Sequence, residues 1–156
     1  MTDTDVFAQL AAEQEEIKFA RFTFDDALAI GLDLVDTARR DRLAITIDVS
    51  IAGQQLFHAA LPGTSPDNDR WVKRKNRVAM HFFRSSYGVA KELEAKGRTL
   101  EQAYGLPAAD YAASGGAVPV VLKGGEVIGT VTVSGLPHQQ DHAMVVDALR
   151  RRLQGA

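Results

Sequence analysis

The chain has 156 residues, a length typical of a single domain, and its 46% hydrophobic and 24% charged residues are ordinary for a globular protein. The formal net charge of −2 gives no overall reason to expect nucleic acid or an anionic membrane as a partner. The longest apolar runs are too short to cross a bilayer. The absence of cysteine excludes disulfides, thiolate metal ligands and a cysteine nucleophile, so we expect a cytoplasmic protein.

The first twenty residues are predicted to form an N-terminal helical extension. They are acidic and lack the basic start and apolar core of a secretory signal. The helix is expected from Asp5 to about Glu16, with Thr4 as its N-cap. A short extended piece, IKFARF, follows at residues 17–22.

A second helix is predicted over residues 22–42. Thr23, with Asp26 three residues later, matches a capping box. Apolar residues then recur at helical spacing, as at Ile30 and Leu34. These features together define the helix start and its buried side.

Residues 43–61 are predicted to form a β-hairpin. Apolar and polar residues alternate along its first half, and Gly53 supplies the turn. A two-residue turn places Leu56 and His58 on the face of Ile47 and Val49, whereas a three-residue turn reverses that assignment.

The second half of the chain is predicted to hold a long helix, a second hairpin and a final helix. The long helix runs from about Asp69 to Lys96, and a kink near Ser85–Ser86 or Gly88 is left open. Its inner stripe is formed by Val78, Phe82, Val89 and Leu93. The hairpin has Gly124–Gly125 as a two-residue turn, which pairs Val118 with Val131 and Val120 with Gly129. The final helix covers about Pro137 to Leu153.

These elements predict one α/β domain over residues 1–156. Two hairpins separated by a long helix suit an antiparallel sheet flanked by helices. The parallel βαβ alternation of nucleotide-binding folds is absent, as are the GxGxxG and Gly-Lys-Ser/Thr phosphate motifs.

The stretch TVSGLPHQQDHA offers the first candidate site. His138 and His142 are four residues apart and share one helical face, with Asp141 beside the second. The HExxH glutamate and a nearby third ligand are missing, so we expect no metal. Two other interpretations stay open: a polar helix start with His138 in water, or a ligand-facing Asp141 or His142.

Two further stretches suit an anionic ligand. The strand regions SGGAVPVV and VTVSG carry glycines and small side chains, which permit close approach of a ligand or a second subunit. The stretch RWVKRKNRVAMHFFRSSY is basic, with Trp71 and Tyr87 as possible stacking surfaces. Its cations either form a solvated face or reach a carboxylate, a phosphate or a haem propionate; they are Arg70, Lys73, Arg74, Lys75, Arg77 and Arg84.

Several stretches together resemble the haem-degrading-domain, or GlcG/HbpS-like, superfamily, and within it a subgroup of small bacterial and fungal proteins. They are GQQLFHAALPGTSPDNDRWVKRKNRV, FRSSYGVAKELEAKG, YAASGGAVPVVL and GTVTVSGLPHQQDHAMVV. The resemblance spans about Phe22 to Leu153. It implies an α/β/α layered domain around a five-stranded antiparallel sheet, and homo-oligomers, often rings of dimers, with pockets near subunit boundaries.

We therefore expect a homo-oligomer that binds a small anionic molecule, with no defined catalytic activity and no assigned cofactor. One alternative is an enzyme acting on haem or another small substrate, with Asp141 or His142 as acid-base group. Another is an oligomeric scaffold that recruits a protein partner. The expected ligand-binding residues combine the motif positions with the basic stretch; they are Lys75, Arg77, Gly115, Gly116, Ser134, Gly135, Asp141 and His142.

Overall fold

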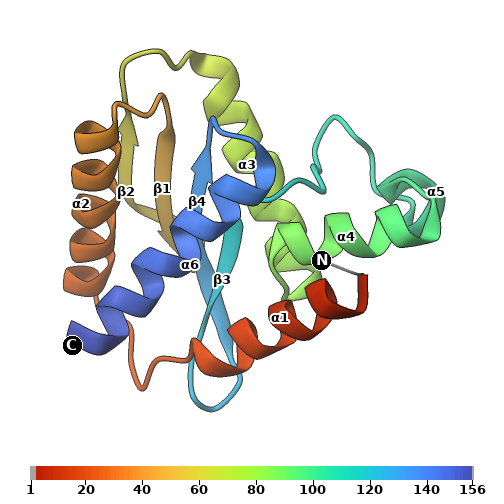
Figure 1. Ribbon diagram of the computed structural model, residues 1–156, viewed down its shortest axis with the longest axis horizontal. Coiled ribbons are helices and arrows are strands. Elements are labelled where there is room, and N and C mark those ends of the chain that lie inside the picture. Colours follow the sequence, from red (N-terminus) through yellow and green to blue (C-terminus); the bar gives the residue numbers. More distant parts are fainter. Residues whose placement is uncertain (1–2, 156) are drawn as a thin grey trace.

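The computed structural model describes residues 3–155 (Figure 1). The helices are α1 (Asp3–Glu16), α2 (Phe24–Asp41), α3 (Pro66–Phe82), α4 (Ser86–Lys96), α5 (Leu100–Tyr104) and α6 (His138–Gly155), and the strands are β1 (Thr46–Ile51), β2 (Gln54–Ala60), β3 (Ala117–Val121) and β4 (Val127–Ser134). Both predicted hairpins are confirmed. Helix α1 starts two residues earlier than expected, so Thr4 lies inside it. None of the helices in the described range is long and apolar enough to cross a membrane.

The sheet has four strands, in the order β2-β1-β4-β3, and every neighbouring pair is antiparallel. The expected fifth strand is therefore wrong. The extended piece after α1 contributes a single parallel bridge, in which Phe19 donates to the Val121 carbonyl and accepts from Lys123 N–H. This pairing does not continue towards the N-terminus, because the N–H groups of Ile17 and Lys18 bond to carbonyls of α1.

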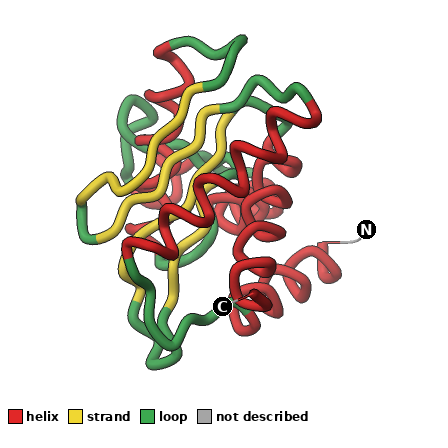
Figure 2. Tube along the Cα trace, turned by 90° about the vertical axis from the view of Figure 1, so that its left-hand side faces the viewer, coloured by secondary structure: helices red, strands yellow, loops and turns green. Residues whose placement is uncertain are grey.

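Helices cover both faces of the sheet (Figures 1 and 2). Helices α2 and α6 bury the apolar face, where the β1 and β4 side chains Ile47, Val49, Val131 and Val133 are fully enclosed. Helix α3 covers the other face. That face carries polar side chains, among them Thr46, Asp48, Thr130 and Thr132. One of the cavities described below lies on this polar face.

The first hairpin has the expected two-residue turn, Ala52–Gly53, and both residues have positive φ. A β-bulge then breaks the alternation between the Val49–Phe57 and Ser50–Gln55 pairs. His58 consequently pairs with Asp48 and leaves the face of Ile47 and Val49, so the predicted face of His58 is wrong.

The second hairpin pairs Val118 with Val131 and Val120 with Gly129, as predicted. Its turn differs from the prediction. The Leu122 N–H bonds to the Glu126 carbonyl and closes a three-residue loop, and the irregularity between Val120 and Val121 restores the expected register.

The predicted long helix is two helices. Phe83 takes the left-handed conformation with φ of 54°, which ends α3, and the Ser85 side chain caps α4 by accepting from Gly88 N–H. Val78, Val89 and Leu93 are buried in a second, small core as expected. Phe82 packs against that core but stays half-buried.

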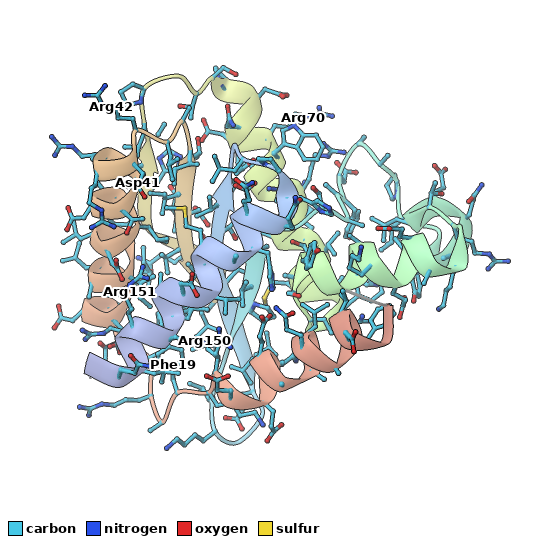
Figure 3. The ribbon with its side chains drawn as sticks, in the orientation of Figure 1. Phe19, Asp41, Arg42, Arg70, Arg150 and Arg151 are labelled. Carbon is cyan, nitrogen blue, oxygen red and sulfur yellow. The ribbon has the colours of Figure 1, made fainter. Side chains whose placement is uncertain are left out.

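Arginines near the end of α6 bind the other helices (Figure 3). Arg150 forms a two-bond pair with Glu16 of α1, and Arg151 does the same with Asp33 of α2. Arg152 bonds to Asp26, the acid of the Thr23 capping box, which is confirmed. The α6 terminus thus joins α1 and α2.

Candidate functional site

A buried ion pair lies where β4 turns into α6. Lys75 of α3 and Asp141 of α6 are only 2% and 1% exposed. The Lys75 Nζ lies 3.2 Å from Asp141 Oδ2 and also donates to the Val133 carbonyl at 3.2 Å. Removing one member of such a pair leaves the other charge buried without compensation.

Asp141 also fixes the backbone of the corner. Its carboxylate accepts from the backbone N–H groups of Leu136 at 3.0 Å and Gly135 at 3.3 Å. Both amides are therefore bound to the chain's own carboxylate. The Ser134 carbonyl, just before them, accepts from the Asn68 side chain at 3.5 Å. The expected binding corner is thus closed by internal contacts.

Burial shifts both members of the ion pair towards their neutral forms. Desolvation lowers the pKa of Lys75, against the attraction of Asp141. Desolvation raises the pKa of Asp141, against Lys75 and the two backbone N–H groups. The attraction between Lys75 and Asp141 opposes these pKa shifts but does not cancel them.

The chain's own atoms fill the space beside the predicted glycines. A Cβ at Gly116, whose φ is 139°, would lie 2.3 Å from the Val133 carbonyl oxygen and 2.8 Å from Lys75 Nζ. At Gly135 it would lie 2.2 Å from the Ala44 carbonyl oxygen, and at Gly115 2.2 Å from that of His138. Each glycine thus allows close packing inside the protein.

His142 binds the N-terminal helix. Its Nε2 lies 2.8 Å from Glu13 Oε1, and its ring stacks on Tyr87 with centroids 4.9 Å apart. Burial opposes ionisation of Glu13, but His142, with help from Gln9 and Arg150, brings the Glu13 pKa below its usual value. The other ring nitrogen, Nδ1, is buried without a hydrogen-bond partner among the described residues.

His138 is part of the structure and does not simply point into water. Its Nδ1 accepts from Gly115 N–H at 3.0 Å, and its ring meets Tyr87 edge-on. Burial lowers its pKa, as do the charges of Lys91 and Lys75. Among the described side chains, residues 5–155, there is no group of three or more His, Cys, Asp or Glu able to hold a metal ion.

The basic stretch divides over different sides of α3. Lys75 points into the corner, whereas Arg77 is exposed and donates to the Asp110 carbonyl. Arg74 stacks on Trp71, with its guanidinium carbon 4.6 Å from the ring centroid, and donates twice to the Ala108 carbonyl. Arg77 is therefore not brought to the corner with the other predicted residues.

An open cavity of about 600 Å³ adjoins this part of α3, and we call it the Trp71 cavity. It combines two arginines, two glutamates and two aromatic rings with apolar and hydroxyl side chains. Its lining consists of Trp71, Arg74, Ala90, Leu93, Glu94, Arg98, Thr99, Leu100, Glu101, Leu106, Ala108, Tyr111, Ala112, Ala113 and Ser114. Ser114 borders Gly115, which packs against the His138 carbonyl at the start of α6.

Sequence reasoning found only part of this lining. Trp71 and Arg74 belong to the basic stretch that it singled out. Arg98 and Tyr111 come from segments without a periodic pattern, and Tyr111 is brought close by the bond from Ala112 N–H to the Arg74 carbonyl. Tyr87, expected as a stacking surface for a ligand, stacks on His142 instead.

Sequence relatives cover nearly the whole chain. A UPF0303 protein of Streptomyces coelicolor is 49% identical over 144 residues, which cover 92% of this chain and 91% of that protein. A UPF0303 protein of Edwardsiella ictaluri is 42% identical over 153 residues, which cover 98% of each.

Solved structures share the fold. The crystal structure of the Ybr137w protein has a TM-score of 0.86 at 27% identity and covers 94% of this chain and 87% of that one. HbpS has a TM-score of 0.65 at 22% identity, with 85% and 90% covered. The PduOC:Heme complex has 0.69 at 16% identity, with 83% and 93% covered. The family model described as haem degrading protein HbpS-like matches residues 22–150, and the chain therefore belongs to the HbpS-like family.

Proposed function

We propose that the chain binds a small anionic molecule with an apolar ring surface in the Trp71 cavity, and that it does so as a cytoplasmic homo-oligomer. The observation that carries the ligand proposal is the position of the Arg74 guanidinium over Trp71 at the wall of this cavity. Arginine has five N–H donors, and the Ala108 carbonyl takes two of them. The rest suit a carboxylate or phosphate, and the indole suits a flat ring. Cavities of about 300–1,000 Å³ are the usual size for small-molecule sites.

In this proposal the buried corner supports the cavity wall. Lys75, Asp141 and Gly116 hold the turn, and Gly115 connects it to Ser114 in the cavity lining. An acid-base role for Asp141 or His142 receives less support, because both side chains are buried and bound within the protein. His142 borders a cavity of about 290 Å³ beside α1, but its Nε2 is already taken up by Glu13.

Haem belongs to the proposed ligand class, since it carries two carboxylates on a flat ring. The family description and the PduOC:Heme complex name haem for related proteins. Among the residues that line the Trp71 cavity there is no histidine, and the phenol of Tyr111 is the side chain of a type that ligates haem iron. Arg74 and Arg98 would hold the propionates.

Titration with haem and with iron-free protoporphyrin tests the ligand proposal. Arg74→Gln should weaken binding of both by about tenfold or more, because it removes charged hydrogen bonds. Arg77→Gln is the matched control, on the same helix but outside the lining, and should leave affinity unchanged. Tyr111→Phe should change the haem absorption spectrum without affecting protoporphyrin. Absence of saturable binding, or equal loss in both arginine variants, would contradict the proposal.

The oligomer proposal is supported by an apolar stripe on α2. Phe24, Leu28 and Leu32 follow one another at four-residue spacing and are 69%, 49% and 48% exposed. We propose that a second copy covers this stripe, with the two α2 helices antiparallel about Leu28. That arrangement sets Phe24 of one copy opposite Leu32 of the other, so the exposed apolar side chains cover one another.

Light scattering coupled to size exclusion tests the oligomer. The wild-type mass should be a multiple of the chain mass of 16.9 kDa, and Leu28→Asp should reduce it. Phe83→Asp removes an equally exposed apolar side chain away from α2 and should leave the mass unchanged. A wild-type monomer, or an oligomer indifferent to Leu28→Asp, would contradict this interface.

A further inference from the structure

A second cavity lies on the polar face of the sheet, between the first hairpin and α3. Its volume is about 470 Å³, and we call it the Asp48 cavity. It is lined by Asp48, Ser50, Gly53, Gln55, His58, Asp69, Val72, Lys73 and Asn76. The four α3 residues of this set have the spacing i, i+3, i+4, i+7, so they share one side of the helix. None of the nine lines the Trp71 cavity.

Asp48 is the buried charge of this cavity. It lies in β1, between two other strands, and is only 2% exposed. Its carboxylate accepts from Ser50 Oγ at 2.9 Å, Gln55 Nε2 at 2.7 Å and Asn76 Nδ2 at 3.2 Å. All three donors are neutral, and no cation of the described chain lies within 4.0 Å. Buried carboxylates are usually paired with a cation, so this one lacks its common partner.

The hydrogen bonds leave acceptors open. A carboxylate offers about four lone-pair sites. Oδ2 of Asp48 accepts two hydrogen bonds and Oδ1 accepts one, so a site remains on Oδ1. The bond from Gln55 Nε2 fixes that amide with its nitrogen towards Asp48, which leaves its oxygen as an acceptor. Asn76 is fixed in the same sense, because its Oδ1 accepts from Thr132.

A second acid stands at the cavity rim. Asp69 Oδ1 and His58 Nε2 lie 2.7 Å apart. The lining carries two carboxylates, Asp48 and Asp69, against one ammonium group, that of the exposed Lys73. Both the charge and the open hydrogen-bond sites call for a cationic donor.

We infer that the Asp48 cavity binds a small ammonium compound, an aliphatic amine with its charged end at Asp48. An ammonium group has three donors and no acceptor, which matches the open acceptors of this lining. It also supplies the missing cation for a buried carboxylate. This site goes beyond the proposed function, because it lies on a different side of α3 and selects the opposite ligand charge.

A matched pair of probes tests the charge requirement. 1,4-Diaminobutane and 1,4-butanediol have the same carbon chain and differ in having ammonium or hydroxyl ends. Titration of each into the full-length protein is followed by NMR, with the side-chain amide signals of Gln55 and Asn76 as reporters. The diamine should produce saturable shifts of these signals and the diol should not. No saturation by the diamine, or the same response to both probes, would overturn the inference.

Variants then test the position of the ammonium group. Asp48→Asn should reduce diamine affinity by about tenfold or more, whereas Lys73→Gln should increase it, because Lys73 repels a cation at the rim. Asp67→Asn makes the same charge change on an exposed acid of α3 outside the lining and is the control. If Asp48→Asn does not fold, the other two variants still test the site: Asp69→Asn should weaken diamine binding and Lys73→Gln should strengthen it. Equal weakening by Asp67→Asn, or unchanged affinity in Lys73→Gln, would mean that the amine binds elsewhere.

Discussion

His142 Nε2 and Glu13 Oε1 lie 2.8 Å apart, so the final helix of the chain binds the first one inside the protein. Helix α1 lies before residues 22–150, which match the family model. It is held there by this buried contact and by the exposed pair of Glu16 with Arg150. The N-terminal extension is therefore an integrated part of the domain.

Glu13→Gln should loosen α1 and lower the free energy of unfolding by about 1–3 kcal/mol, the cost of disturbing a buried charged hydrogen bond. The contribution should also depend on pH. Because the folded-state pKa of Glu13 is lowered, its stabilisation is complete above the unfolded-state value and is lost as pH falls through the folded-state value. Urea unfolding at neutral and acidic pH measures both effects. Arg150→Gln, which breaks the exposed pair, should cost no more than about 1 kcal/mol.

Lys75→Met or Asp141→Asn should each destabilise the protein by about 3–5 kcal/mol, because each leaves a buried group without its partner. The double variant should cost less than the sum of the two, since no unpaired charge remains. Denaturant unfolding of all four proteins completes the cycle. Arg77→Met, on the exposed side of the same helix, should change stability by less than about 0.5 kcal/mol. Additive losses would argue against direct coupling.

Gly116→Ala should be among the most damaging small substitutions in the chain. The added Cβ would collide with the Val133 carbonyl and Lys75 Nζ, at a φ that alanine rarely adopts. We expect a loss of more than about 3 kcal/mol in thermal or urea unfolding. Gly155→Ala meets no atom within 4 Å and has no unusual φ, so it should be neutral. Similar effects at both positions would contradict the packing described here.

Phe82→Ala and Phe83→Ala compare neighbouring phenylalanines in different surroundings. Phe82 packs against the small core of Val78 and Val89, but it is half-buried, so its loss should fall below the about 3–5 kcal/mol of a fully buried phenylalanine. Phe83 is 54% exposed and should cost less than about 0.5 kcal/mol. Equilibrium unfolding measures both. A loss of about 3–5 kcal/mol for Phe82→Ala would contradict the half-buried position described above.

Local patterns predicted most of the fold. The turn glycines located both hairpins, and the predicted pairing of Val118 with Val131 holds because the irregularity at Val120–Val121 compensates for the longer turn. The Thr23 pattern located the start of α2. The β-bulge near Leu56 and the left-handed residue Phe83 were not predictable, because neither position carries a glycine or another residue typical of such geometry. The missing fifth strand has a similar cause. The N–H groups of Ile17 and Lys18 bond to carbonyls of α1 and are therefore not available to pair with β3, and no sequence pattern shows this.

The candidate sites were predictable only in part. The motif positions Lys75 and Asp141 do come together, but burial and internal bonding depend on tertiary contacts that no spacing reveals. The Asp48 cavity did leave a signal, the polar residues at i, i+4 and i+7 from Asp69. The cavity residues of β2 could not be assigned to the same face as Asp48 from the sequence, because the bulge changes the face on which His58 lies.

Helix α3 presents a different side to each of three neighbours: Trp71 and Arg74 to one cavity, Asp69 and Lys73 to the other, and Lys75 to the buried corner. All three sets of side chains are carried by one helix, so a rotation of α3 would displace the walls of both cavities together, and the buried Lys75–Asp141 pair opposes such a rotation.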